Sequence, residues 1–439
     1  MLNKMFHNNH IQSAFAQIGT AVLAFVSFVI LARWFTKSEF GIWIIYLTLI
    51  TFLDMTKAGM VQTALIKYTS GASEREKKEF LGSSWLINLS LVGVIGVLCY
   101  STLLLGFINW ESINLFLFYY PIYSLVSMPF YYFNWVNQAA GNFRQITFIR
   151  LLNSSLFLFA VVARISFEYT IEDLISLHIL VFTATSLFLV FSGKVVVKSV
   201  LFATKKSVKR IVAYGKYHAL AFLGSNLLKS SDIMLIGFVL GPISVAIYSI
   251  PLRLIEIIEM PLKSCVQVAF PAFSKYDNQN KSTYLKEVVE RYIGSLSILY
   301  IPFMFGLFFF SEHIVHLVGG DKYTNSVGIF RIFLVYGLFL PFDRLTGISL
   351  DAIGKPRINF YKVLVMALVN IVGDLAALYY FKSLELAAWV TVATVLTGML
   401  VGFLMVKKHV GIDLKGILIN GQNGLKMFVQ NMVSKKNRI

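Results

Sequence analysis

Apolar residues gather along this chain into long runs of about 18 to 25 residues, separated by short polar connections. A helix of about 20 residues crosses the hydrocarbon core of a bilayer. The pattern therefore predicts an all-α polytopic membrane protein with about twelve transmembrane helices. The expected spans are Ile11–Ala32, Phe40–Ile66, Leu81–Leu105, Leu115–Gln138, Gln145–Ala163, Leu174–Val197, Tyr217–Leu240, Ile243–Phe273, Val288–Phe310, Val327–Ile353, Phe360–Tyr380 and Leu384–Val406.

The composition agrees with this interpretation. Hydrophobic residues make up 57% of the chain and charged residues only 14%, and the mean hydropathy is +0.71. Soluble domains usually carry about a quarter charged residues. The chain therefore has too little polar surface for a soluble protein.

The net charge of +17 is explained by membrane topology. Basic residues lie between the apolar runs and not on one soluble face, which argues against a nucleic-acid partner. With the N-terminus inside, the cytoplasmic connections collect about 28 Lys and Arg residues and the opposite side about five. We therefore expect a multi-pass protein with both termini in the cytoplasm.

The chain also matches itself when it is shifted by about 205 positions. In this register Asp54-Met55 meets Glu259-Met260, and a second match pairs Ala139–Arg144 with Ala352–Arg357, both of the form A-x-G-x-x-R. Any two apolar helices share Leu and Ile, but the aligned acidic residue and this motif favour a duplication.

The duplication predicts two six-helix bundles, residues 1–200 and 201–408, related by a parallel, pseudo-twofold repeat with a cleft between them. Residues 409–439 form a basic cytoplasmic tail. This tail would be either a short interfacial helix on an anionic leaflet or a disordered segment.

Several spans carry ionisable residues, which cost about 3 kcal/mol each at the bilayer centre and usually face a cavity or a partner. One explanation is that opposite charges on the same helix neutralise each other. The other is a hydrated, cationic cavity for an anionic cargo, since guanidinium and ammonium groups bind phosphate oxygens. The substrate-binding candidates are Lys57, Lys229, Arg253, Glu256 and Arg344, and the candidates for ion coupling are Asp54, Asp232 and Glu259.

Aromatic residues of the fourth span offer a further contact, because their rings can stack on sugar faces; packing or interface positions would explain them equally well. They are Tyr119, Tyr120, Tyr131, Tyr132 and Trp135. We predict no catalytic residue, no metal site and no cofactor. The two cysteines, Cys99 and Cys265, lack metal-ligand spacing, and no Walker-type phosphate loop is present.

Five stretches, in chain order, resemble the polysaccharide and O-antigen flippases (Wzx-type). They include an E-F-G entry to the second span and a G-K-P-R turn after the tenth. The stretches are Leu31–Ile42, Asp54–Tyr68, Ser231–Tyr248, Arg253–Ser274 and Ala352–Arg357. These flippases form a branch of the multidrug/oligosaccharidyl-lipid/polysaccharide (MOP) exporter superfamily.

The resemblance implies a MATE-like fold and a flippase that moves undecaprenyl-diphosphate-linked O-antigen or capsule units from the cytoplasmic to the periplasmic leaflet of the bacterial inner membrane. It implies alternating access driven by H⁺ or Na⁺, a monomer among membrane lipids, and association with a polysaccharide polymerase and a chain-length regulator. It assigns Lys57, Lys229, Arg253 and Arg344 to the diphosphate or to acidic sugars.

Two other functions remain open. A drug/cation antiporter of the same superfamily would favour an acidic, aromatic cavity, whereas these spans mix Lys and Arg with their acids. A membrane polymerase or glycosyltransferase would need catalytic acids on an external loop, and the external connections are short. The sequence therefore favours a transporter over an enzyme.

Overall fold

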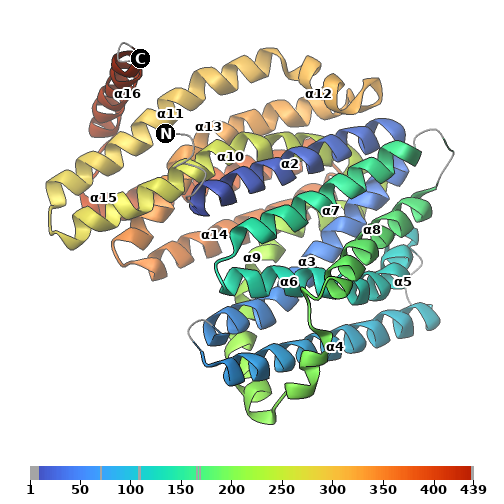
Figure 1. Cartoon of the computed structure of the whole chain (residues 1–439). Coiled ribbons are helices and arrows are strands. Elements are labelled where there is room, and N and C mark those ends of the chain that lie inside the picture. The colour runs from blue at the N-terminus through green and yellow to red at the C-terminus, as the bar shows by residue number, and fades with distance from the viewer. Residues whose placement is uncertain (1–8, 70–71, 107–109, 165–166, 168–169, 437–439) are drawn as a thin grey trace. The chain divides into compact units, whose positions relative to one another are not determined.

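The computed structural model describes residues 9–436 apart from 70–71, 107–109, 165–166 and 168–169 (Figure 1). Inside its helices, the side chains of 9–18, 221, 225–229, 428–429 and 431–436 are outside the described part. The described residues form helices and turns and contain no strand. The predicted all-α fold is confirmed.

Contacts divide the chain into two compact units, residues 1–230 and 231–439. The first contains α2 (Asn9–Trp34), α3 (Lys37–Thr69), α4 (Glu74–Leu104), α5 (Glu111–Val126), α6 (Met128–Ala139), α7 (Phe143–Arg164), α8 (Ile171–Phe191), η1 (Val197–Phe202) and most of α9 (Lys205–Leu240). In this unit α2 lies along α7, and α3 contacts α4, α5 and α6 (Figure 1).

The second unit contains the end of α9 and then α10 (Pro242–Asn278), α11 (Ser282–Phe309), α12 (Ser311–Gly319), η2 (Asp321–Tyr323), α13 (Ser326–Ala352), α14 (Pro356–Leu375), η3 (Ala376–Tyr380), α15 (Leu384–Val410) and α16 (Leu414–Lys436). Helix α13 is central here, because it packs on α10, α11 and α15. The predicted bundle boundary at residue 200 stays a prediction.

Every predicted span falls on a helix of the structure. Among the described residues, eight helices are each long and apolar enough to cross a membrane. Helices α5 and α6 meet the same test together and bend by 49° at their junction, where Pro129 opens α6. Helix α10 is not among these eight, because it carries more charged residues than a membrane-spanning helix usually does. The chain is a multi-pass membrane protein, and the count of twelve stays a prediction.

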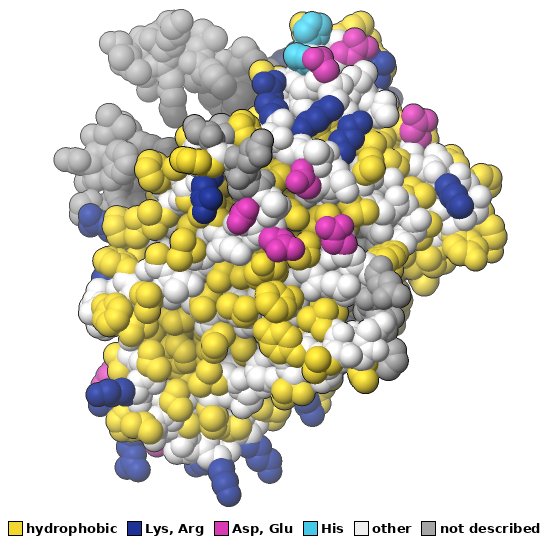
Figure 2. All heavy atoms as spheres, turned by 90° about the vertical axis from the view of Figure 1, so that its right-hand side faces the viewer, with side chains coloured by type: hydrophobic (Ala, Val, Ile, Leu, Met, Phe, Trp, Pro, Cys, Tyr) yellow, Lys and Arg dark blue, Asp and Glu magenta, His cyan; other side chains and the backbone are white. Residues whose placement is uncertain are grey.

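Large apolar side chains point outward from the helices of both units. Phe159 and Phe191 in the first unit and Leu404 in the second are more than half exposed. Figure 2 shows hydrophobic side chains covering much of one face. Apolar surface of this extent is unfavourable in water and is suited to contact with lipid chains.

Local sequence explains where several helices begin. Ser73 and Glu76 form a capping box at the start of α4, and Thr170 and Asp173 form another at α8. Such boxes satisfy backbone N–H groups that have no partner inside the helix. Helix α10 begins at Pro242 after Gly241, whose φ of 81° favours glycine.

The helices of the two units follow the same order. Helix α3 begins at Lys37 and α10 at Pro242, 205 residues later, and α7 begins at Phe143 and α14 at Pro356, 213 residues later. The order is compatible with the predicted duplication, which stays a prediction.

The segment after the last span is helical. The two alternatives for the tail were an interfacial helix and a disordered segment, and the structure contains a helix, α16. This helix packs on α11 of the same unit.

Candidate functional site

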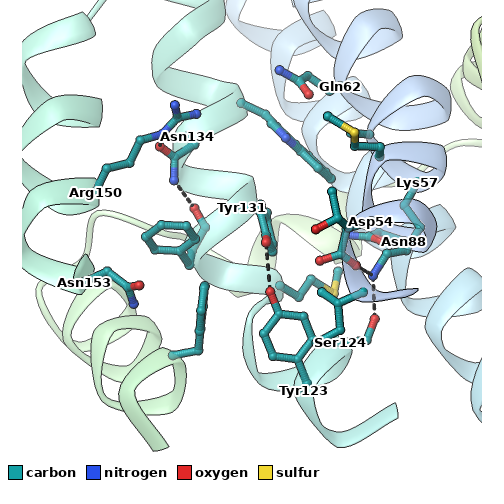
Figure 3. Close-up of a pocket in the computed structure, with 18 of the residues that line it drawn as sticks. Asp54, Lys57, Gln62, Asn88, Tyr123, Ser124, Tyr131, Asn134, Arg150 and Asn153 are labelled. Carbon is teal, nitrogen blue, oxygen red and sulfur yellow. Dashed lines mark hydrogen bonds and ion pairs between the residues drawn. The ribbon is translucent and has the colours of Figure 1, made fainter. Parts of the chain in front are cut away.

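A pocket of about 450 Å³ lies inside the N-terminal unit, lined by residues of α2, α3, α4, α5, α6, α7 and α8 (Figure 3). Its wall combines charged, carboxamide and aromatic side chains in a bundle that is otherwise apolar. It brings together two residues predicted as site residues, Asp54 and Lys57, and others that the sequence did not single out.

Asp54 and Lys57 form a buried ion pair on one face of α3. They stand three residues apart, Lys57 Nζ lies 2.7 Å from Asp54 Oδ1, and their side chains are only 11% and 8% exposed. Lys57 also donates to Ser124 Oγ at 2.6 Å, and the Tyr120 hydroxyl donates to Asp54 Oδ1 at 3.2 Å. The ammonium is therefore held by α3 and α5 together.

The other side of the pocket carries a second cation, on α7. Arg150 Nε donates to Asn134 Oδ1 at 3.0 Å, and its side chain is open to the pocket. The hydroxyls of Tyr123 and Tyr131 lie 2.9 Å apart between this side and the ion pair (Figure 3). The sequence analysis did not select Arg150 as a site residue. The signal that could have found it is a basic residue within the predicted span Gln145–Ala163.

Aromatic residues of the fourth span divide into different roles. Tyr131 and Trp135 line the pocket. Tyr120 is fully buried against Asp54, and Tyr132 packs on Trp85 with a centroid distance of 4.6 Å. Tyr119 lines a separate cavity near Glu111.

Glu259 is the centre of a second polar cluster, inside the C-terminal unit. Its Oε1 accepts a hydrogen bond from the Tyr336 hydroxyl at 2.8 Å. Lys263 lies 3.3 Å from Oε2, and Arg344 lies 3.7 Å from Oε1. The structure thus brings together two predicted site residues, Glu259 and Arg344.

Behind Arg344 lies a fully buried ion pair. Lys362 Nζ is 2.6 Å from Asp343 Oδ1, both side chains are almost inaccessible, and Arg344 lies 3.9 Å from the same carboxylate. Arg344 itself keeps 45% of its side-chain surface exposed. Asp343 and Arg344 are adjacent charges in the predicted span Val327–Ile353, and Arg344 was a predicted site residue. Lys362, in the predicted span Phe360–Tyr380, was not selected from the sequence.

The two units thus hold comparable arrangements. In each, a buried carboxylate on the second helix of the unit accepts a hydrogen bond from a tyrosine and pairs with a cation: Asp54 with Tyr120 and Lys57, and Glu259 with Tyr336 and Arg344. Asp54 and Glu259 are also the acids aligned in the predicted repeat.

Arg253, Glu256 and Glu259 recur every three residues along α10, a spacing that would place them in one polar stripe, but the structure separates them into two parts. Arg253 donates to Glu256 at 2.8 Å, and both side chains are partly exposed. Glu259 is buried and turns to α13 instead. Two carboxylates therefore do not share the Arg253 guanidinium.

Asp232 belongs to a cluster of oxygen atoms in the C-terminal unit. Tyr248 donates to Asp232 Oδ2 at 3.2 Å, and Thr391 lies 3.5 Å from the same oxygen. The fully buried Asp374 carboxyl is near enough to Asp232 for the two to interact electrostatically. Ser231, next to Asp232, donates to Asn370 Oδ1 at 3.2 Å. Asp374 is an acidic residue within the predicted span Phe360–Tyr380, which is the signal the sequence offered for it; Asn370 and Thr391 gave no signal.

Lys229 and Asp232 stand three residues apart on α9, so neutralisation within one helix was one alternative for them and a cavity for an anionic cargo was the other; the Lys229 side chain lies outside the described residues, and both alternatives stay predictions. In the part of the chain that the structure describes, no group of three His, Cys, Asp or Glu side chains could hold a metal ion.

Known proteins resemble the chain in both sequence and fold. Residues 30–328 match the family described as "Polysaccharide biosynthesis protein". A protein named "Probable low-salt glycan biosynthesis flippase" from Haloferax volcanii is 22% identical over 176 residues, which are 40% of this chain and 37% of that protein. The chain thus aligns with less than two fifths of that relative.

Two solved structures share the fold over nearly the whole chain. The lipid II flippase MurJ in an inward closed conformation has a TM-score of 0.72 at 18% identity, covering 96% of this chain and 93% of its own. An inward-facing multidrug resistance MATE family transporter of the MOP superfamily has a TM-score of 0.70 at 13% identity, covering 93% and 95%. The predicted MATE-like fold is confirmed.

Proposed function

We propose that this chain, which belongs to the polysaccharide biosynthesis protein family, is a flippase that moves a lipid-linked glycan across a membrane by alternating access. The relative named as a glycan biosynthesis flippase and the fold shared with the lipid II flippase support this function over an enzymatic one. The cargo we propose is an undecaprenyl-diphosphate-linked O-antigen or capsule unit, carried to the periplasmic leaflet of the inner membrane.

The observation that carries this proposal is the sign of the accessible charges. Arg344 keeps 45% of its side-chain surface exposed, while the acid nearest to it, Glu259, is buried and hydrogen-bonded. A guanidinium with free N–H groups binds phosphate oxygens in a bidentate manner. An accessible cation inside apolar helices therefore suits a diphosphate better than a cationic drug.

The test is transport by the purified full-length protein in liposomes. A fluorescent undecaprenyl-diphosphate oligosaccharide should become accessible to a quencher outside the vesicles, and Arg344→Gln should slow this movement at least about tenfold, as loss of a charge-assisted hydrogen bond predicts. Arg357→Gln, an exposed position at the start of α14, is the matched control.

A deletion strain distinguishes the second candidate, a drug/cation antiporter. Loss of surface polysaccharide would support the flippase. Normal polysaccharide together with sensitivity to cationic dyes would contradict it.

The Asp232 cluster supports coupling to a monovalent cation, H⁺ or Na⁺. The fully buried Asp374 carboxyl and the partly buried Asp232 carboxyl lie in one cluster, and a proton or a monovalent cation between them would offset their mutual repulsion. The surrounding groups from Tyr248, Thr391 and Asn370 supply oxygen ligands. We propose that Asp232 and Asp374 take up the coupling ion.

Imposed gradients test this coupling in the same liposomes. A pH gradient or a Na⁺ gradient should accelerate transport by the wild-type protein, and Asp374→Asn should abolish the acceleration while leaving the slow basal movement. If neither gradient changes the rate, the carboxyl pair has a structural role.

A further inference from the structure

In the pocket of the N-terminal unit, two buried acceptor atoms have no hydrogen-bond partner among the described residues. Asn88 is only 4% exposed and lines the pocket, and its Oδ1 has no hydrogen-bond partner among the described residues. Asp54 Oδ2 is also buried and accepts no hydrogen bond within that part of the chain. Buried acceptors without partners are costly and rare in proteins, so these two atoms point to a ligand with hydrogen-bond donors.

Arg150 supplies donors on the other side of the pocket. In Figure 3 it lies opposite Asp54 and Lys57. Of its five N–H groups, one is bound to Asn134 Oδ1, and the described residues provide no further partner. Because the charges of Asp54 and Lys57 cancel, the guanidinium leaves the pocket with a net positive charge.

Aromatic rings lie between the acceptor side and the donor side. Tyr123, Tyr131 and Trp135 all line the pocket, as do Phe130 and Phe182. The volume of about 450 Å³ is in the usual range of small-molecule sites, about 300–1,000 Å³. A pyranose matches this arrangement, since its hydroxyls donate and accept at the ring edge while its C–H faces are apolar.

We propose that this pocket is a subsite for a sugar ring of the cargo. Hydroxyl groups of the sugar donate to Asp54 and Asn88, and Arg150 donates to oxygens at the opposite edge. The net positive charge favours an acidic sugar, whose carboxylate binds the guanidinium in a bidentate manner. This inference rests on the proposed function for the idea that a glycan enters the protein.

The probes are soluble fragments of such a cargo, each tested against the detergent-purified full-length protein by saturation-transfer difference NMR. They are glucose, glucuronate and, as a competitor, inorganic pyrophosphate. Glucose and glucuronate should both bind, glucuronate more tightly. Pyrophosphate, whose oxygens can also bind the Arg150 guanidinium, should compete with glucuronate but should leave glucose bound.

Two variants and one control locate the binding. Arg150→Gln should weaken glucuronate binding by roughly 10- to 100-fold, the range expected for loss of a charged hydrogen bond, and glucose binding less. Asn88→Leu should weaken both sugars. Arg144→Gln, two turns earlier on α7 and exposed, should change neither. The melting temperature of each variant shows that it is folded.

Three outcomes would overturn the inference. The first is sugar binding that Arg150→Gln and Asn88→Leu leave unchanged, and the second is displacement of both sugars by pyrophosphate. The third is the absence of any sugar signal, in which case the pocket holds water only. Transport of the lipid-linked glycan in liposomes is measured separately. A wild-type protein that transports but shows no sugar in the pocket refutes the subsite alone, whereas one that binds sugars but does not transport refutes the flippase.

Discussion

The ion pair of Asp54 and Lys57 joins two residues of one helix and takes further hydrogen bonds from another helix. Asp54 pairs with Lys57 one turn away on α3, the Tyr120 hydroxyl of α5 donates to Asp54 Oδ1, and Lys57 donates to Ser124 of α5. In low dielectric, removing one member of such a pair leaves an uncompensated charge. Pairing within one helix could be expected from sequence, but the partners from α5 could not.

The Asp54–Lys57 pair gives a direct test. Lys57→Met and Asp54→Asn should each lower the free energy of unfolding by about 3–5 kcal/mol, because each leaves a buried charge without its partner. The double variant should lose less stability than either single variant. Thermal unfolding in detergent measures this. Lys77→Met is the control: Lys77 and Glu74 have the same spacing and a similar 2.8 Å distance but are exposed, so the effect should stay within about 1 kcal/mol. Single variants no less stable than the double variant would contradict the prediction.

Lys362 should act on Arg344 through Asp343. Without Lys362, the cation left near the buried Asp343 carboxylate among the described side chains is Arg344, 3.9 Å away. We expect Lys362→Met to draw Arg344 toward Asp343 and to slow transport about tenfold or more. Adding Asp343→Asn should restore much of the rate.

Rescue distinguishes this role from simple loss of fold. The transport rate of Lys362→Met with and without Asp343→Asn is compared in liposomes, and the exposed Lys355→Met serves as control. If the double variant transports no better than Lys362→Met alone, Lys362 does not position Arg344.

At the scale of elements, the C-terminal helix α16 is fastened to α11. The buried Glu290 on α11 accepts hydrogen bonds from the Asp413 N–H at 3.0 Å and from Asn420 at 2.8 Å. Lys286 pairs with Asp413 at 2.7 Å. The helices approach closely at Gly294 and Gly421, where a Cβ on Gly421 would lie 2.6 Å from the backbone of Gly294.

We therefore expect Gly421→Leu to undock α16, because the added side chain meets backbone that cannot move aside. Hydrogen exchange of the backbone amides in residues 411–427 should become faster by at least about tenfold. Asn423→Leu, an exposed position on the same helix, should leave exchange unchanged. Slow exchange in Gly421→Leu would show that the docking does not depend on this contact.

The docking should also survive mild acid. The hydrogen bond from Lys286, together with that from the Gly416 N–H, holds the pKa of Asp413 below its usual value. Its stabilising effect is therefore present above the unfolded-state pKa of about 3.9 and is lost only as the pH falls through the lower folded-state value. The protection factors of the amides in residues 411–427, which are corrected for the intrinsic pH dependence of exchange, should be unchanged from about pH 8 to about pH 5. A fall in protection within that window would show that another group controls the docking.

At the scale of the whole molecule, the distribution of Lys and Arg predicts the orientation in the membrane. In a variant without Cys99 and Cys265, Asn280→Cys, in the turn between α10 and α11, should face the cytoplasm. Lys322→Cys, in η2, should face the other side. A membrane-impermeant maleimide on intact cells should label Lys322→Cys and spare Asn280→Cys until the cells are opened. The reverse pattern would invert the topology.

The sequence by itself determined the class of protein and the course of the chain. Apolar runs of spanning length can only be helices, because every backbone hydrogen bond must be made inside the bilayer, so each predicted span fell on a helix. Charges in those runs also marked Asp54, Lys57, Glu259 and Arg344 as important, since burial of a charge is costly whatever the fold.

Only the tertiary structure decided which groups meet. Arg150 and Asn88 are ordinary polar residues on separate helices, and no spacing along the chain indicates that they face one pocket with Asp54. Likewise Asp374, Asn370 and Thr391 join Asp232 from α14 and α15. Periodicity reports which face of one helix is apolar, whereas a site is a property of how several helices pack, and that depends on side-chain shapes distant in sequence.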